Sequence, residues 1–448
     1  MKLQTRKVLD KSFTGMGFMS IFLLSAALIM VLAPIFARGI GAFVFRATSE
    51  FRRLDNSLHG RGSIQAVEAE TRLVQDAREP VYRMLAEFEA QLDAGNVANG
   101  DELYAELDEI RNLINRLLGP RPGESVPVLM RDRFGKTRWD KARETLHHIL
   151  YRETWDYSDP TKMGVQVEVP RAASFKGTAL EPLFPYLENN LERMLRPRLT
   201  LYWGFLFDES HDAHFFGGIW PEMLGTLYLV FGTMLFAIPI GVIAAVYLTE
   251  FATQGKVVSL LRTFISTLAG VPSIVFGLFG LAFFINTLKI SSSKSVLAGS
   301  MTLALLVLPT IIRASEEAIK AVPRTYKEAS LSLGASRIHT VARVILPAAL
   351  PGILTGIVIS MGRAAGETAP IIFTAAVSVG KPLGLLETLN QPTPALPWNI
   401  YNLATEHEAV DEIRHVQFGM VFTLVLLVLL LNLAAIILRA RVSKKLRG

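Results

Sequence analysis

Long uncharged apolar runs dominate the pattern of hydrophobic and polar positions along this chain. They occupy residues 12–37, 223–249, 263–288, 295–312 and 415–438, and a sixth starts at residue 344 and continues past two charged positions to residue 380. A helix needs roughly 20 apolar residues to cross the hydrocarbon core of a bilayer, because lipid cannot satisfy exposed backbone polar groups. The pattern therefore predicts six membrane-spanning helices.

The prolines within or beside these apolar runs include those at positions 239, 272, 309, 351 and 370. Proline removes a backbone donor and its ring clashes with the preceding turn of a helix. We therefore expect bends or hinges at these positions, which in membrane proteins are tolerated beside cavities.

The stretch between the first two runs, residues 38–215, has the amphipathic periodicity of a soluble domain. Two sets of apolar residues at helical spacing each define one helix face: Val81, Leu85, Phe88 and Leu92, and then Leu103, Leu107, Ile110, Ile114 and Leu117. A further helix is predicted near residues 139–151 and a short strand at residues 165–169. The chain thus reads as an all-α membrane protein that carries a mainly helical soluble insert.

The charge distribution separates the same two parts. Residues 38–215 contain 52 charged residues in 178 positions, whereas residues 216–448 contain only 29 in 233. The whole chain of 448 residues has a formal net charge of +6 and no cysteine. The lack of cysteine excludes a disulfide framework, a cysteine-type zinc site, an iron–sulfur cluster and thiol catalysis.

Lysine and arginine in the short loops predict the orientation. An N-terminus on the cytoplasmic side places 17 basic residues of the short loops and tails in the cytoplasm and leaves only Lys289, Lys294, Lys381 and Arg414 outside. Basic residues favour the cytoplasmic side, although long translocated domains escape this rule. We expect a cytoplasmic N-terminus and first helix in residues 1–37, an insert on the outer side of the membrane in 38–215 (periplasmic, if the resemblance described below holds), and a five-helix membrane core in 216–448. The first apolar run is too long for a cleaved signal peptide, so we expect it to be retained.

A cytoplasmic loop between the fourth and fifth spans, residues 313–347, is far longer than a connector requires. Residues 323–333 suit a short helix, Gly334 permits a sharp turn, and residues 335–344 continue as a second helical piece before Pro347 opens the next span. Such a helix–turn–helix beneath the membrane is suited to docking a cytoplasmic partner. The alternative is an amphipathic helix that only lies on the lipid surface.

The residues of this loop resemble a known signature. The chain has Glu328-Ala329-Ser330, then Gly334, then Val344-Ile345-Leu346-Pro347, and the loop of ABC importer permeases reads E-A-A, three residues, G, nine residues, I-x-L-P. The spacing is kept in full, with serine and valine as mild departures. The resemblance implies a six-helix type I importer permease fold and coupling to a separate ATPase subunit, with the candidate coupling residues Glu328, Ala329, Ser330, Gly334, Leu346 and Pro347.

A narrower resemblance covers most of residues 216–448. Residues 270–277, 308–313 and 362–370 look like motifs of phosphate transport permeases of the PstA type. This resemblance implies a bacterial inner-membrane location and a set of partners: a PstC-like second permease subunit, two PstB-like ATP-binding subunits and a periplasmic phosphate-binding protein. ATP and Mg would bind the ATPase subunits, and this chain would bind lipid but no cofactor and no nucleic acid.

Arg363 and Glu367 are the charged pair inside the sixth apolar stretch. A charge in the hydrocarbon core costs about 2.5–3.5 kcal/mol even on lenient insertion scales, so it seldom faces lipid. The spacing i, i+4 puts both side chains on one helix face, and a guanidinium offers a planar fork of donors that matches phosphate. We predict that Arg363, Glu367 and Arg313 belong to a substrate pathway. The alternatives are a purely structural ion pair and, for Arg313, snorkelling or contact with the ATPase.

The sequence leaves three candidate functions for this chain. We favour a permease subunit that moves inorganic phosphate by alternating access while partner subunits hydrolyse ATP, since no Walker motif is present and we expect no catalytic site. A permease for sulfate, molybdate or another oxyanion is the nearest alternative, and a membrane-anchored periplasmic sensor or assembly protein is a different class. His211 and His214, beside Asp208 and Asp212, are metal-ligand types, but polar residues ahead of a span need no special reason, and we expect no metal site.

Overall fold

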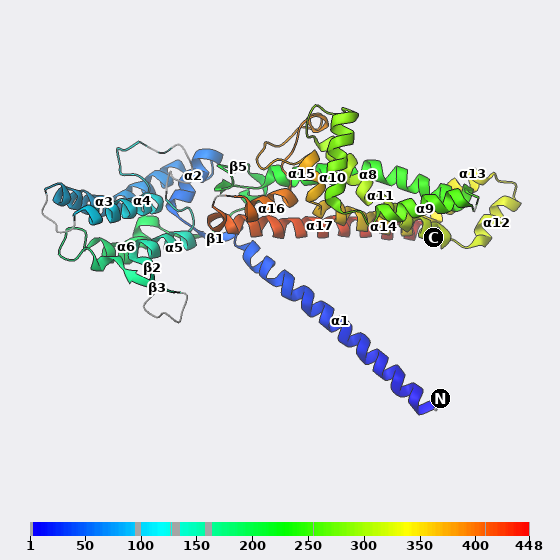
Figure 1. Cartoon of the computed structure of the whole chain (residues 1–448), viewed down its shortest axis with the longest axis horizontal. Helices are drawn as coiled ribbons and strands as arrows, with labels where there is room; N and C mark the ends of the chain where they lie inside the picture. Colours follow the sequence, from blue (N-terminus) through cyan, green and yellow to red (C-terminus); the bar gives the residue numbers. More distant parts are fainter. Residues whose placement is uncertain are drawn as a thin grey trace. The chain divides into compact units, whose positions relative to one another are not determined.

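The computed structural model describes residues 3–94, 100–125, 127, 135–156, 164–253, 255–407 and 409–447. The chain divides into two compact units. The first, here called the helical unit, comprises residues 1–42, 204–210 and 217–448, and the second, here called the insert, comprises residues 43–203 and 211–216. Figure 1 labels the elements of both units.

The helical unit is built from long helices joined by short helical pieces. Its α-helices are α1 (Leu3–Ile40), α7 (Gly204–Phe207), α8 (Trp220–Val246), α9 (Lys256–Leu268), α10 (Ser273–Gly280), α11 (Val296–Lys320), α12 (Arg324–Ser332), α13 (Arg337–Thr340), α14 (Leu346–Gly366), α15 (Ala369–Thr374), α16 (Leu396–Thr405) and α17 (Val410–Arg447). Its other helical segments are η3 (Tyr247–Phe251), η4 (Leu281–Thr287), η5 (Val341–Ile345) and η6 (Glu387–Leu389).

Five helical stretches in the described part of the chain are long and apolar enough to cross a membrane: Ser12–Ile40, Trp220–Phe251, Val296–Lys320, Arg337–Gly366 and Val410–Lys444. The predicted third span is instead a bent pair, in which α9 and the segment Ser273–Thr287 meet at 102° (Figure 1). Counted as one span, this pair makes the sixth. The helical membrane class predicted from the sequence is therefore confirmed.

The prolines act unequally. Pro272 lies at the break between α9 and α10, and Pro370 lies in the first turn of α15 just after α14 ends. Pro239, Pro309 and Pro351 lie inside α8, α11 and α14, which continue through them. The expected bend is thus confirmed at Pro272, where the helix pair is bent by 102°, and the preceding helix has ended before Pro370 is reached.

Helix α11 packs closely against α14 through small residues. A Cβ atom built on Gly356 would lie 2.3 Å from Cβ of Ala314, and one built on Gly352 would lie 2.6 Å from Cβ of Ala318. As the residue number rises along α14 it falls along α11, so the two helices are antiparallel. Small residues let backbones approach and gain dispersion contacts.

Replacing Gly356 with isoleucine is expected to separate α11 from α14 and to lower the thermal midpoint of the purified chain. Overpacking a close interface costs about 1–3 kcal/mol, and the clash is with a Cβ atom that cannot rotate away. The measurement is thermal unfolding in detergent. Gly366→Ala is the matched control, because a Cβ there meets nothing within 4 Å. Equal midpoints for both variants would contradict the packing argument.

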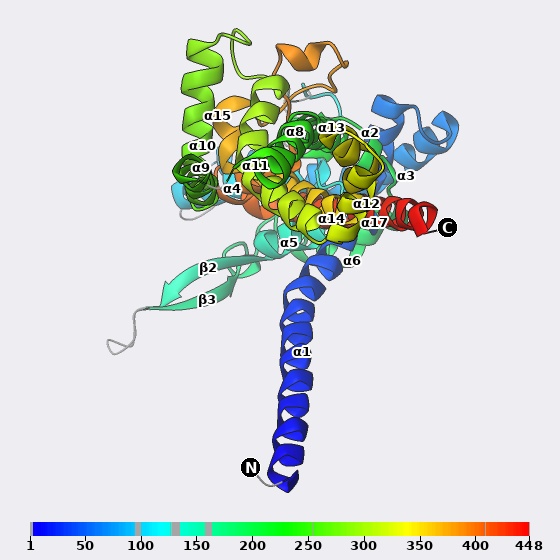
Figure 2. The ribbon, with the colours of Figure 1, turned by 90° about the vertical axis from the view of Figure 1, so that its right-hand side faces the viewer.

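The insert has six helical segments, α2 (Ser49–His59), α3 (Ile64–Asp93), α4 (Gly100–Leu118), α5 (Trp139–Leu150), η2 (Arg171–Ala173) and α6 (Leu183–Leu195), and the strands β1 (Val44–Ala47), β2 (Tyr151–Asp156), β3 (Val165–Pro170) and β4 (Arg198–Leu201), all counted within the described residues. Strands β2 and β3 pair antiparallel as a two-stranded ribbon (Figure 2). The short strands β5 (Ser210–His211) and β6 (Phe216–Gly217) lie where the chain passes from one unit to the other.

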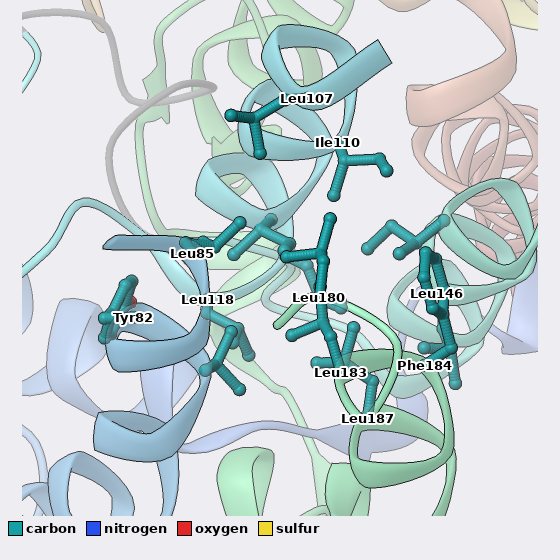
Figure 3. Packing of buried hydrophobic residues seen from close by; sticks show 14 of the residues in the cluster. Tyr82, Leu85, Leu107, Ile110, Leu118, Leu146, Leu180, Leu183, Phe184 and Leu187 are labelled. Atoms are coloured by element: carbon teal, nitrogen blue, oxygen red, sulfur yellow. The ribbon is translucent and has the colours of Figure 1, made fainter. Parts of the chain in front are cut away.

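The hydrophobic core of the insert is formed where α3, α4, α5 and α6 meet (Figure 3). Both predicted helix faces are buried in it: Phe88 of α3 and Ile110 and Ile114 of α4 have no exposed surface. The helix predicted near residues 139–151 and the strand predicted at residues 165–169 are α5 and β3. The helix predictions are confirmed because one buried face and one solvated face leave a clear periodic signal, whereas Val167 and Val169 of β3 are both exposed.

Polar contacts close the core at its edge. Arg78 of α3, only 6% exposed, donates through Nη1 to Oε1 of Glu50 at 2.7 Å and to the carbonyl of Leu118 at 2.7 Å. Tyr82 donates to the carbonyl of Gly119 at 3.0 Å, and burial raises the pKa of Tyr82 to about 12. The hydroxyl therefore stays protonated as a donor.

The two ends of the insert lie side by side. Strands β1 and β4 pair antiparallel, with Val44 opposite Leu201 and Ala47 opposite Arg198. The backbone N–H of Tyr202 donates to the carbonyl of Phe43 at 2.7 Å and extends the pairing by one step. The main segment of this unit, residues 43–203, thus begins and ends at one two-stranded stem.

Candidate functional site

Arg363 lies in the last turn of α14. Its Nε donates to Oε1 of Glu367 at 3.3 Å, and the exposed fractions of the two side chains are 39% and 18%. Most of the guanidinium's donor capacity is therefore not used by this one contact. The pair presents an arginine fork on an open surface of the single chain, with an acid at its side.

The helix that carries this pair ends earlier than the apolar stretch suggests. Helix α14 stops at Gly366, and Glu367 is extended, with φ −77° and ψ 125°. Pro370 explains the stop, because in a continuous helix its ring would clash with the carbonyl of Gly366 and leave it without a donor. Glu367 thus reaches Arg363 from the residue that caps the helix rather than from inside a span.

Arg313 lies on α11, which continues beyond it to Lys320. Its Nη2 donates to Oγ of Ser266 on α9. The antiparallel alignment of Gly356 with Ala314 puts Arg313 level with residue 357, so the two arginines are about 9 Å apart along the helix direction. The structure does not bring them together in one contact; they lie at different levels of the unit.

The loop that carries the E-A-A motif projects from the helical unit. Helix α12 has no buried residue, and Gly334 follows it with φ 82° in open space. Glu328, Ala329 and Gly334 are exposed, whereas Leu346 and Pro347 open α14 and are half-buried. Figure 1 shows α12 and α13 at the end of this unit where α17 and the chain end. An uncovered helix at a glycine turn is suited to docking.

Two polar contacts hold α12 to the rest of the unit. Lys327 Nζ lies 2.5 Å from Oε2 of Glu250 in η3, the segment that continues α8. Ser330 Oγ lies 3.0 Å from Oγ1 of Thr340, which is 1% exposed. Sequence reasoning missed Glu250 and Lys327 because 77 positions separate them and neither lies in a periodic pattern.

Between α12 and the helices lies a hollow of about 650 Å³. It is lined by residues of η3, α9, α11 and α12, among them Arg262 and Lys320. Glu316 lies 3.7 Å from Nη2 of Arg262 and 3.0 Å from Nζ of Lys320. The hollow thus lies between α12 and the helices η3, α9 and α11.

Replacing Ser330 with alanine is expected to lower the rate of substrate uptake, the activity that the resemblance of this loop implies, by no more than about twofold. The substitution removes one hydrogen bond, with a net worth of about 1 kcal/mol, and leaves the Lys327–Glu250 pair in place. Uptake and the thermal midpoint are to be measured beside Ser332→Ala, which alters the same helix at an exposed position. A loss above tenfold for Ser330→Ala alone would mean that this bond is the main tether.

A buried acid lies far from both arginines in the sequence. Glu222, in the first turn of α8, is 1% exposed and accepts from Nδ2 of Asn399 on α16 at 3.0 Å. Thr226 also joins α8 to this region, since its Oγ1 accepts from the backbone N–H of Leu396 at 2.9 Å. In the sequence, Glu222 directly precedes the apolar run of residues 223–249. An acid in that position would be interpreted as a solvent-exposed residue at the membrane surface, so its burial could not be predicted.

The region of the candidate metal ligands is a tight turn. Asp212, Ala213 and His214 all have positive φ, and His214 is 5% exposed. His211 belongs to β5, and Asp208 follows α7 and is 7% exposed. The expectation that these residues hold no metal stays a prediction.

Comparison with known proteins places the similarity in the C-terminal half. Residues 237–448 match the family model described as binding-protein-dependent transport system inner membrane component. A probable ABC transporter permease protein YqgI of Bacillus subtilis is 37% identical over 239 residues, which are 51% of this chain and 80% of that protein. A phosphate transport system permease protein PstA 1 of Mycobacterium tuberculosis is 36% identical over 234 residues, 52% of this chain and 73% of that protein.

Solved structures are similar over the same share of the chain. An inward-facing MetNI methionine ABC transporter has 21% identity and a TM-score of 0.39, with coverage of 50% of this chain and 94% of that chain. A bacterial ABC transporter involved in the import of the acidic polysaccharide alginate has 15% identity and a TM-score of 0.40, with coverage of 52% and 80%.

Proposed function

Because this chain belongs to the family of binding-protein-dependent transport system inner membrane components, the permeases of ABC importers, we propose that its cargo is inorganic phosphate. The observation that carries the proposal is the Arg363 fork beside Glu367 in a chain whose relatives include phosphate permeases of 36% and 32% identity. A planar guanidinium donates two parallel hydrogen bonds to a tetrahedral oxyanion.

The proposed topology places both chain termini in the cytoplasm and the insert in the periplasm of a bacterial inner membrane. The excess of lysine and arginine in the loops assigned to the cytoplasm supports this orientation. Helix α12 and the C-terminal end of α17 lie at the same end of the helical unit (Figure 1). This placement also supports a cytoplasmic C-terminus, since a loop that docks an ATPase must lie in the cytoplasm.

The proposed mechanism is alternating access driven from outside this chain. Two ATP-binding PstB-like subunits would hydrolyse ATP with Mg, and Glu328, Ala329, Ser330 and Gly334 would receive their motion. The Lys327–Glu250 contact would pass it to α8. A PstC-like subunit would complete the pathway, and a periplasmic binding protein would deliver phosphate. Since this chain is a transporter component, the chemistry of hydrolysis belongs to its partners.

Within the pathway, Arg363 would bind the anion and Glu367 would limit how tightly it is held. The carboxylate lies 3.3 Å from Nε of Arg363, where it tethers the fork and repels an approaching anion. Binding must be favourable enough to capture phosphate and weak enough to release it. Arg313, about 9 Å nearer the coupling end, is placed to meet the anion later in its passage.

The test is uptake of radiolabelled phosphate by cells that depend on this chain, with sulfate and molybdate as competitors. Phosphate uptake that resists a tenfold excess of either competitor is the expected result. Uptake that sulfate or molybdate abolishes would instead support the alternative cargo, since a fork of donors does not by itself distinguish tetrahedral anions. The sensor or assembly alternative predicts no uptake at all, and the family assignment disfavours it.

A further inference from the structure

A groove of about 760 Å³ on the insert gathers four arginines. They come from three elements and one junction: Arg46 of β1, Arg193 of α6, Arg198 of β4, and Arg196 between α6 and β4. Two carboxylates, Asp76 of α3 and Glu192 of α6, line the same groove. Since arginine stays protonated in proteins, the lining has an excess of two positive charges.

In the part of the chain that the structure describes, three of these arginines form long ion pairs, and Arg46 also lies over the ring of Trp139, 5.4 Å from its centroid. Among the described residues, none of the four guanidinium groups donates a hydrogen bond, and their nearest carboxylates are at 3.6 Å: Glu192 for Arg46, and Glu70 for Arg196 and Arg198. Glu70 is already engaged by Arg52 at 2.8 and 2.9 Å. The groove therefore offers oriented donors to a ligand without first breaking short ion pairs.

Arg196 is held in a conformation that arginine rarely adopts. Its φ is 45°, at the C-cap of α6, where glycine is the common residue. Its N–H donates to the carbonyl of Glu192 at 2.8 Å, and its own carbonyl accepts from Nη2 of Arg52 at 2.7 Å. Left-handed backbone at a residue with a Cβ is unfavourable and is retained where the surroundings enforce it, often at ligand sites.

We propose that this groove binds a divalent tetrahedral oxyanion, such as hydrogen phosphate. Two net positive charges match a dianion, and guanidinium forks match its oxygens. A lipid phosphodiester carries only one negative charge, so the charge balance favours a free anion or a monoester over a headgroup. The site lies outside the helical unit and is separate from the Arg363 pathway, so it goes beyond the proposed transport function.

The test measures binding of ³²P-labelled inorganic phosphate to the full-length chain in phosphatidylcholine nanodiscs by equilibrium dialysis. The chain carries Arg363→Gln, which removes the main donor of the candidate pathway. Adding Arg196→Gly and Arg198→Gln is expected to weaken binding at least about tenfold, since two charge-assisted contacts are lost. Glycine suits the left-handed position, so the thermal midpoint without anion should not fall.

The matched control is Arg83→Gln, an exposed arginine of α3 that does not line the groove. Binding that is unchanged by the double substitution would overturn the proposal, and so would equal losses in the control. Sulfate is expected to displace phosphate, whereas phosphatidylglycerol nanodiscs should leave the affinity unchanged; strong competition by that lipid would overturn the assignment of a free dianion. Phosphate uptake is measured separately, so failure of the transport proposal would leave this result readable.

Discussion

Cells whose only copy of this chain carries Arg363→Gln are expected to take up phosphate at the background rate, although the chain inserts and assembles normally. The substitution removes the charge and one arm of the fork while it keeps a side chain of similar length. Each charge-assisted hydrogen bond is worth about 1.5–3 kcal/mol, which corresponds to roughly tenfold to a hundredfold in binding. The measurement is initial-rate uptake of ³²P-labelled phosphate, with the amount of chain in the membrane determined in parallel.

The competing explanation is a structural ion pair with Glu367, and the double variant Arg363→Gln/Glu367→Gln separates the two. If the pair only joins segments, neutralising both partners removes the uncompensated charge and should restore most of the uptake. If Arg363 binds substrate, the double variant stays inactive. Arg414→Gln is the matched control, since it breaks an exposed arginine–aspartate pair in α17. Uptake near the unmodified rate for Arg363→Gln would end the pathway hypothesis.

Reversing the charge of Lys327 is expected to uncouple ATP hydrolysis from transport. Lys327→Glu places a carboxylate opposite Glu250, which is 11% exposed, and like charges at short range in a partly buried site repel strongly. Helix α12 has no buried residue, and of the two polar contacts described above only that of Ser330 with Thr340 would remain. Uptake should fall at least about tenfold, whereas ATP hydrolysis by the assembled transporter continues.

The charge swap makes this prediction specific. Lys327→Glu combined with Glu250→Lys restores an ion pair of opposite polarity, and it should recover a substantial part of the uptake and of the ratio of phosphate moved to ATP hydrolysed. The exposed neighbour variant Arg324→Glu introduces the same change of charge in α12 without touching Glu250. If Arg324→Glu reduces uptake as strongly, or if the swap recovers nothing, the contact is not what transmits the motion.

The sequence was sufficient for the features that are periodic or continuous along the chain. Phe88 and Ile110 could be placed in the core of the insert because each belongs to a helix with one buried face. The long spans were visible because lipid demands uninterrupted apolar length. A bend at Pro272 was expected because proline removes a backbone donor and its ring clashes with the preceding turn, although its size of 102° was not.

The end of α14 and the attachment of α12 were not predictable in this way. Apolar composition resumes after Glu367, so the sixth run reads as one span although the helix stops at Gly366. Glu250 and Lys327 look like two ordinary solvated charges, and only the fold brings them to 2.5 Å. The groove of the insert could not be predicted for the same reason. Arg46 is distant in sequence from Arg193, Arg196 and Arg198, and the pairing of β1 with β4 brings these residues together in space. Where these charges meet is decided by tertiary packing, which leaves no local trace.

The stem of β1 and β4 has a consequence for how such a chain can arise and be altered. Paired strands hold opposite Cα atoms only about 5 Å apart, so the two points at which Val44 and Leu201 join the insert could be bridged by a turn of a few residues. A gene could therefore gain or lose the segment 43–203 as a single cassette without lengthening the path between α1 and α8. Replacing the whole cassette at the stem would leave the sequence of the helical unit unchanged.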